Sequence, residues 1–181
     1  MNRDLLLSAL LAPMAAYVAP ALAEDFLTVA QAQQALFPAA TQFAGHTLQF
    51  TSEQRAEIKK LAGSRQRDDQ QKVWRAERDG ELLGWFVVDD VIGKHEFITY
   101  ALAISPDGNV LGIEVMSYRE THGSEVRKAE WRDQFTGKDL QDTLRLGKDI
   151  SNISGATLSC RNITDGVKRL LTQWDLYLRN G

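Results

Sequence analysis

The chain has 181 residues, 44% of them hydrophobic, which is enough for one domain with a substantial apolar core. Its 21 basic and 24 acidic residues give a net charge of −3, so it lacks the basic surplus of a nucleic-acid binder and we expect no nucleic-acid partner. The lone Cys160 excludes a disulfide within the chain.

Residues 1–23 have the three parts of a secretory signal peptide. A short positive start at Arg3 is followed by an apolar run over 5–19 and by small residues over 21–23. The competing interpretation is a retained membrane anchor, but the run is at or below the roughly 20 residues that a spanning helix needs, and Pro13 and Pro20 interrupt it. We therefore expect cleavage after residue 23 and a mature periplasmic protein.

The next segment, 24–70, is expected to be a helical flank of the main domain. The patterns over 28–36 and 52–61 are those of short amphipathic helices. The second is expected to open with Ser52 as its N-cap and to end at Gly63.

The main domain is expected over 71–181 and combines strands with helices. Turn sequences at 78–80 and 106–109 separate strand-like runs, and two later segments have helical spacing of apolar residues. The predicted fold class is therefore α+β, a small antiparallel sheet packed with helices. The predicted strands are 72–77, 81–88, 97–104 and 110–118, and the predicted helices are 124–135 and 161–178.

Several common cofactor motifs are absent from the sequence. It has no glycine fingerprint for a dinucleotide, no Walker-type phosphate loop, no Cys-x-x-Cys-His haem motif and no multi-cysteine run. The three histidines, His46, His95 and His122, have no metal-ligand spacing, so we predict no metal site.

The tetrapeptide from Ser154 to Thr157, Ser-Gly-Ala-Thr, is the most informative stretch of the chain. It precedes the last predicted helix, where unpaired backbone N–H groups and the helix dipole attract anions. Gly155 and Ala156 allow a ligand close to the backbone, and Thr157 offers a hydroxyl nucleophile. From these residues alone, a bound phosphate and an ordinary threonine N-cap are both open.

Two ordered blocks of the sequence resemble the FMN-binding domain family. The run from Asp149 to Thr157 is similar to that family's flavinylation motif, an Asp followed by Ser/Thr-Gly-Ala-Thr. The run from Tyr118 to Val126, followed by Trp131, is similar to the Glu-Thr-Pro-Gly segment and the tryptophan of the FMN-carrying subunits of the sodium-pumping NADH:quinone reductase and the Rnf complexes. The resemblance covers roughly residues 82–178.

The resemblance implies a covalent cofactor. In that family a flavin transferase takes FMN from FAD and joins its phosphate to the last threonine of the motif, which here is Thr157. Asp149 belongs to the motif that the transferase recognises. Because the transferase must reach Thr157, we expect this residue at the surface.

The resemblance also implies a set of residues around the flavin. Glu120 and Thr121 should lie near it, whereas His122 departs from the family's usual proline and adds a titratable donor. Trp131 either lies against the isoalloxazine or belongs to the core. Lys94 either stabilises the negative charge of a reduced flavin or ends a charged hairpin. The expected cofactor-binding residues are Thr157, Ser154, Gly155, Ala156, Asp149, Glu120, Thr121, Leu158, Trp131 and Lys94, and no catalytic residue is assigned.

The resulting prediction is a periplasmic electron-transfer flavoprotein with FMN on Thr157, more a carrier than a self-sufficient enzyme, because the sequence has no nicotinamide motif. Its expected partners are the flavin transferase and a membrane-bound redox partner. Two alternatives stay open: a secreted module that holds flavin or another phosphate ligand without a covalent bond, and an accessory subunit of a membrane redox complex.

Overall fold

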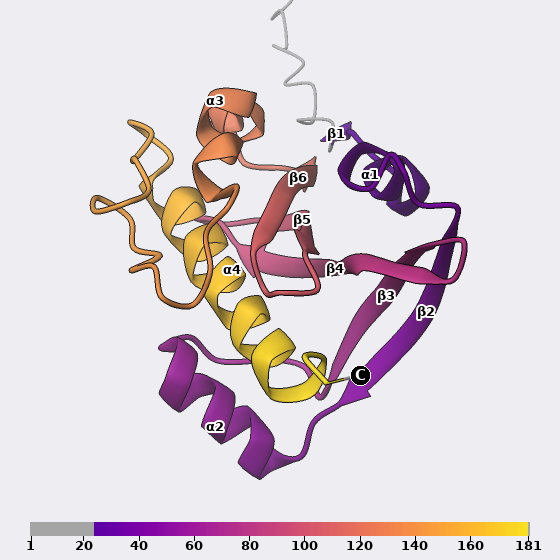
Figure 1. The fold of residues 1–181 in the computed structure, drawn as a ribbon. Coiled ribbons are helices and arrows are strands. Elements are labelled where there is room, and N and C mark those ends of the chain that lie inside the picture. The colour runs from indigo at the N-terminus through magenta and orange to yellow at the C-terminus, as the bar shows by residue number, and fades with distance from the viewer. Residues whose placement is uncertain (1–23, 181) are drawn as a thin grey trace, which may run out of the picture.

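The computed structural model describes residues 24–180, so the expected signal peptide lies outside the described residues. The centre of the fold is an antiparallel sheet with the strand order β1-β6-β5-β4-β3-β2 (Figure 1). Its strands are β1 (Glu24–Asp25), β2 (Gln42–Gln49), β3 (Gln70–Arg78), β4 (Glu81–Ile92), β5 (Phe97–Ile104) and β6 (Val110–Tyr118). The predicted α+β class and the four predicted strands are confirmed.

Helices cover both faces of this sheet. The long α4 (Thr157–Tyr177) packs against β4 and β5 with α2 (Ser52–Ala62) beside it, and α1 (Val29–Leu36) packs on the other face against β4, β5 and β6. The larger core lies under α4, where Tyr100, Leu102 and Ile104 of β5 are fully buried. The alternating Ala101 and Ala103 face the smaller core under α1.

The segment expected as a helical flank also contributes β1 and β2 to the sheet. Strand β2 was not predicted, because in this edge strand only Leu48 is buried and no alternating apolar pattern results. The prediction of Ser52 as N-cap is wrong: Thr51 is the N-cap and forms a reciprocal capping box with Gln54. Gly63 does end α2, with a φ of 80°.

The single helix expected over 124–135 is also wrong. The segment forms a 3-10 turn η1 (Ser124–Arg127), the short α3 (Ala129–Arg132) and a second 3-10 turn η2 (Asp133–Phe135). Lys128 is extended, with a ψ of 140°, and separates the first two pieces. The buried Val126 and Trp131 are five positions apart, a spacing that one continuous helix cannot place on one face.

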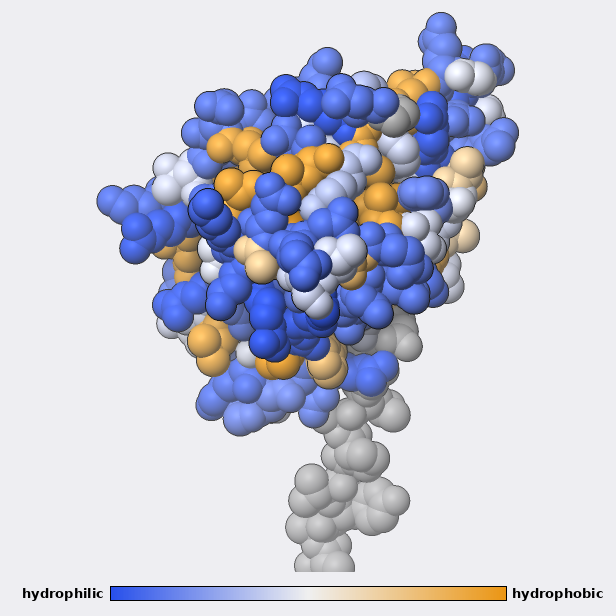
Figure 2. All heavy atoms as spheres, turned by 90° about the horizontal axis from the view of Figure 1, so that it is seen from below, coloured by the Kyte–Doolittle hydropathy of each residue, from blue (hydrophilic) through white to orange (hydrophobic). Residues whose placement is uncertain are grey.

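The surface seen from below in Figure 1 is largely hydrophilic, with hydrophobic residues showing between the polar ones (Figure 2). No helix within residues 24–180 is long and apolar enough to cross a membrane. The most exposed large apolar side chains are Leu61, Phe97, Ile92, Leu111, Leu158 and Val29.

Candidate functional site

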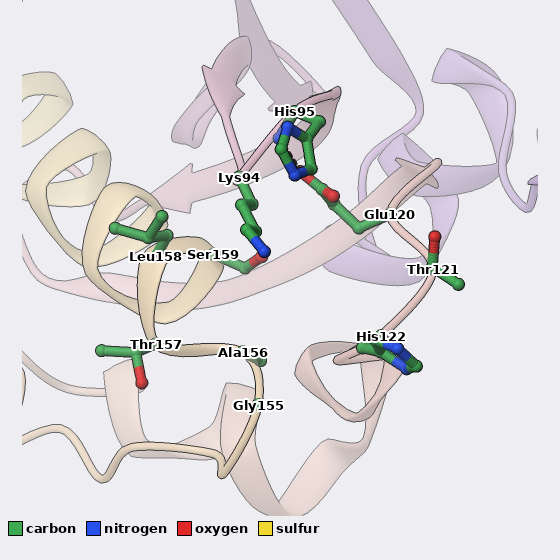
Figure 3. Close-up of a pocket in the computed structure, with 10 residues that line it drawn as sticks. All are labelled: Lys94, His95, Glu120, Thr121, His122, Gly155, Ala156, Thr157, Leu158 and Ser159. Carbon is green, nitrogen blue, oxygen red and sulfur yellow. Dashed lines mark hydrogen bonds between the residues drawn. The ribbon is translucent and has the colours of Figure 1, made fainter.

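Three segments that are distant in sequence meet around one cavity of about 360 Å³ (Figure 3). They are the turn between β4 and β5, the loop after β6 and the start of α4. The register of the sheet brings the first two together, because Ile98 at the start of β5 pairs with Tyr118 at the end of β6. The volume is within the range of about 300–1,000 Å³ typical of ligand pockets. The lining residues are Lys94, His95, Glu120, Thr121, His122, Gly155, Ala156, Thr157, Leu158 and Ser159.

Thr157 is the first residue of α4, and its side chain is exposed, as we expected for a modified residue. Its Oγ1 atom accepts a hydrogen bond from Nδ2 of Asn152 over 3.1 Å. The N-cap of α4 is Ala156, and no side chain caps this helix start. The interpretation of Thr157 as an ordinary N-cap is therefore wrong.

The uncapped start of α4 leaves backbone N–H groups available to an anion. The first N–H groups of a helix have no partner within the helix and carry the positive end of its dipole. Gly155, whose φ is 83°, leads the chain into this turn, and no atom lies within 4 Å of the place its Cβ would occupy. A phosphate therefore has open access to this helix start.

Glu120 lies below the β4–β5 turn and accepts hydrogen bonds from it. Its Oε1 atom accepts from the backbone N–H of His95 at 2.5 Å and from that of Glu96 at 3.0 Å. Partial burial raises the pKa of Glu120, but the backbone hydrogen bonds and the charge of His95 outweigh it, so the pKa is lowered overall. Glu120 is therefore a carboxylate at neutral pH.

Tyr118 contacts two of the segments that line the cavity. Its hydroxyl donates to the backbone oxygen of His122 at 2.5 Å and lies 3.2 Å from Oγ of the buried Ser159. Gly123, with a φ of 90°, packs against Ala156 so closely that a Cβ would lie 2.3 Å from the alanine Cβ. These contacts join the loop after β6 to the start of α4.

The exposed rim of the cavity includes cationic and titratable groups. The side chains of Lys94, His95, Thr121 and His122 are all exposed on it. Lys94 and Thr121 were predicted as binding residues and His122 as a titratable donor in the loop, whereas no role at the flavin was predicted for His95. Ser159 was not predicted, and its place in the first turn of α4 beside Tyr118 becomes apparent only in the fold.

Asp149 does not line the cavity but organises the loop before it. Its two carboxylate oxygens accept hydrogen bonds from the backbone N–H of Leu144 (2.9 Å) and Arg145 (2.8 Å), and Lys138 Nζ lies 3.5 Å away. Partial burial raises the pKa of Asp149, but these partners outweigh it and lower the pKa. Ser154 is exposed and likewise lies outside the cavity lining.

Trp131 belongs to the core rather than to the cavity. Only 4% of it is exposed, its ring packs edge-on against Phe135, and its Nε1 donates to the backbone oxygen of Ser151 at 2.9 Å. The interpretation of Trp131 as a face for the isoalloxazine is therefore wrong. Its hydrogen bond instead anchors the loop that carries Asn152.

No group of three or more His, Cys, Asp or Glu residues within the described chain is arranged to hold a metal ion. Cys160 is fully buried, and burial raises the pKa of its thiol, so it is a packing residue rather than a reactive one.

Comparison with known proteins finds similarity over this region. Residues 93–172 match the FMN-binding domain family, and this range contains all ten residues that line the cavity. The resemblance inferred from the two sequence blocks is confirmed.

Among curated proteins, a subunit of the proton-translocating ferredoxin:NAD(+) oxidoreductase complex of Clostridium ljungdahlii is 32% identical over 111 residues, covering 56% of this chain and 60% of that protein. The corresponding subunit of an ion-translocating oxidoreductase complex of Stutzerimonas stutzeri is 30% identical over 111 residues, covering 55% and 49%. The chain thus spans about half to three-fifths of the length of these relatives.

Two solved structures share the fold. NqrC of Shewanella oneidensis superposes with a TM-score of 0.52 at 21% identity, covering 78% of this chain and 81% of that one. A subunit of the Na(+)-translocating NADH-quinone reductase of Parabacteroides distasonis gives a TM-score of 0.55 at 14% identity, covering 86% and 87%.

Proposed function

We propose that this chain, which carries an FMN-binding domain over residues 93–172, is an electron carrier with FMN joined by a phosphoester to Oγ1 of Thr157. The observation that carries the proposal is the position of Thr157. Its exposed hydroxyl stands at an uncapped helix start, on the edge of a cavity that Lys94 also lines. The hydroxyl nucleophile, the helix start that would bind the phosphate and the lysine cation thus lie around the same cavity.

FAD is the FMN donor in the proposed attachment step. A flavin transferase would use FAD, so that the bond between Oγ1 and the FMN phosphorus forms as the pyrophosphate bond breaks and AMP leaves. The hydroxyl proton leaves with the transferase base or with water. The chain contributes an accessible acceptor, since Thr157 and the preceding Gly155 are both exposed.

The residues of the cavity fit the two ends of such a group. The N–H groups at the start of α4 suit the phosphate, and Leu158, which is 41% exposed and lines the cavity, offers an apolar surface beside it. A bound flavin supplies the electron transfer. Lys94 would stabilise negative charge that develops on it, because a fixed cation lowers the energy of a nearby anion.

The location and partners belong to the same proposal. An export signal in residues 1–23 would place the chain in the periplasm, and the similarity to subunits of ion-translocating redox complexes supports a membrane-bound redox partner. The chain would accept electrons there and pass them to another acceptor.

Denaturation after co-expression with a flavin transferase tests covalent attachment against non-covalent binding. We expect yellow colour and flavin fluorescence to stay with the unfolded chain through gel filtration in urea. Flavin that elutes with the small molecules would instead favour a module that binds it non-covalently. A chain that stays colourless under every expression condition would favour an accessory subunit with an inactive site.

A further inference from the structure

The turn between β4 and β5 is held by a side chain from another strand connection. This turn, residues 93–96, is closed by the hydrogen bond from Gly93 N–H to Glu96 O at 2.8 Å. Glu120, from the loop after β6, lies beside His95 of this turn (Figure 3). Its Oε1 atom accepts hydrogen bonds from the backbone N–H groups of both His95 and Glu96. One carboxylate oxygen therefore binds two consecutive backbone donors, an arrangement that suits an anion.

Gly93 makes this contact possible. A Cβ at this position would lie 2.5 Å from Oε1 of Glu120 and 3.0 Å from its Cγ. Gly93 does not have a left-handed φ, so close approach to Glu120, and not backbone strain, is what excludes a side chain here. The Glu120 carboxylate therefore packs directly against the backbone of the turn at Gly93.

The residue that this turn carries toward the cavity is Lys94. Its side chain is exposed and lines the cavity, as Glu120 and Thr157 also do. An exposed lysine on a short turn has many rotamers and a mobile backbone, and its charge acts on a bound group only if the turn is held in place. The hydrogen bonds of Glu120 supply that restraint.

We propose that Glu120 is a positioning residue, whose carboxylate latches the turn of residues 93–96 so that the Lys94 ammonium group stays beside the bound flavin and raises its reduction potential. This inference rests on the proposed function for the flavin, whereas the latch itself stands on the hydrogen bonds alone. It assigns to Glu120 a role that acts through Lys94.

The direction in which the flavin's reduction potential changes distinguishes this positioning role from a direct effect of the Glu120 charge. If Glu120 acted only through its own charge, removing that charge would favour the reduced, more negative flavin and raise the potential. If it acts through Lys94, breaking the latch moves a cation away and lowers the potential. Both contributions can be separated by substitution.

Four variants distinguish the direct charge effect of Glu120 from its effect through Lys94. Gly93→Ala pushes Oε1 away while leaving the charges of Glu120 and Lys94 in place. Glu120→Gln removes the charge but retains an oxygen acceptor, and Lys94→Met removes the cation. Glu125→Gln, at an exposed carboxylate in η1, is the matched control for loss of one negative charge.

Hydrogen exchange on the flavin-free chain tests the latch. Gly93→Ala should speed exchange of the His95 and Glu96 amides by about tenfold or more, while Glu125→Gln leaves their exchange unchanged. Unchanged exchange in Gly93→Ala would overturn the latch. This measurement needs no flavin, so it decides the latch even if attachment to Thr157 fails.

Potentiometry on the flavin-loaded chain tests the positioning. The reduction potential should fall in Gly93→Ala and in Lys94→Met. In the double variant that carries both substitutions it should fall no further than in Lys94→Met alone. In Glu120→Gln it should stay at or above the wild-type value. The proposal would be overturned if the drops in potential of the two single variants added up in the double variant. It would also be overturned if the potential of Gly93→Ala equalled that of the wild type.

Discussion

The side-chain amide of Asn152 donates a hydrogen bond to Oγ1 of Thr157 over 3.1 Å. This contact occupies one lone pair of the acceptor hydroxyl and leaves its proton free to depart. Because Asn152 follows Ser151, whose backbone oxygen accepts from Trp131, the core tryptophan indirectly fixes the donor. The predicted flavin attachment site is thus held in place before any transferase arrives.

Asn152→Ala should slow FMN attachment without preventing it. The loss of one hydrogen bond leaves Thr157 exposed but releases its rotamer, so we expect the initial rate to fall by roughly 5–10-fold, equivalent to about 1–1.5 kcal/mol. Asn152→Asp should be slower still, because a carboxylate repels the incoming phosphate. The measurement is the mass increase with time under a limiting amount of transferase. Equal rates in all three proteins would contradict the role of Asn152.

Gly123→Ala should destabilise the fold. An alanine there would have a φ of 90° and a Cβ 2.7 Å from the Tyr118 hydroxyl, in addition to the contact with Ala156. Backbone strain and overpacking together should lower the free energy of unfolding by about 2–4 kcal/mol. The measurement is urea unfolding.

Gly137→Ala is the matched control, because its φ is 80° but no atom lies within 4 Å of the added Cβ. It should cost only the backbone strain, about 1 kcal/mol. Equal losses in both variants would show that Gly123 is not closely packed against α4.

A buried ion pair joins α4 to the sheet. Arg169 Nη2 lies 2.5 Å from Oδ2 of Asp89, which also accepts from the Tyr100 hydroxyl at 2.8 Å, and the two charged side chains are 8% and 9% exposed. Arg169→Met leaves a buried carboxylate without its cation. We expect a loss of about 3–5 kcal/mol in urea unfolding at neutral pH.

The same substitution should show a pH dependence of known sign. Burial raises the pKa of Asp89, and the charge of Arg169 opposes that rise. Without Arg169 the folded-state pKa rises further above the unfolded value, so the folded variant takes up a proton first as the pH falls. The deficit relative to wild type should shrink from neutral pH toward pH of about 4, near the pKa of an unperturbed Asp.

Arg179→Met removes an exposed pair with Asp175 and is the control. It should cost less than about 0.5 kcal/mol at any pH. A deficit in Arg169→Met that stays constant or grows as the pH falls would contradict the assignment of a buried charge to Asp89.

Local patterns of sequence predicted the regular elements well. The strands 97–104 and 110–118 have the predicted bounds because turn residues and dense apolar runs mark both. The predicted helix over 161–178 begins earlier, at Thr157, because the only large apolar residue of its first turn, Leu158, is exposed and does not belong to the buried apolar face. The edge strand β2 was missed because its stability comes from pairing with β3 rather than from burial of its own side chains.

Most of the predicted site residues that line the cavity are in or next to the two motifs and also lie together in the fold, and Lys94 is the exception distant from both motifs. Thr157, Gly155, Ala156, Leu158 and the Glu120 loop do so, whereas Trp131 shares the motif but is needed for the core. The contact of Glu120 with His95 and Glu96 spans 25 and 24 positions. Such pairs form only when the strands between them are paired in their final register, so residues near Glu120 in the sequence do not reveal them.

Covalent attachment of FMN to Thr157 is tested by the intact mass of the denatured chain after co-expression with a flavin transferase, for wild type, Thr157→Ala and Ser154→Ala. We predict an increase equal to one FMN, less one water, in the wild type and in Ser154→Ala, and the unmodified mass in Thr157→Ala. A wild-type chain without the adduct, or an adduct that persists in Thr157→Ala, would show that FMN is not attached through Thr157.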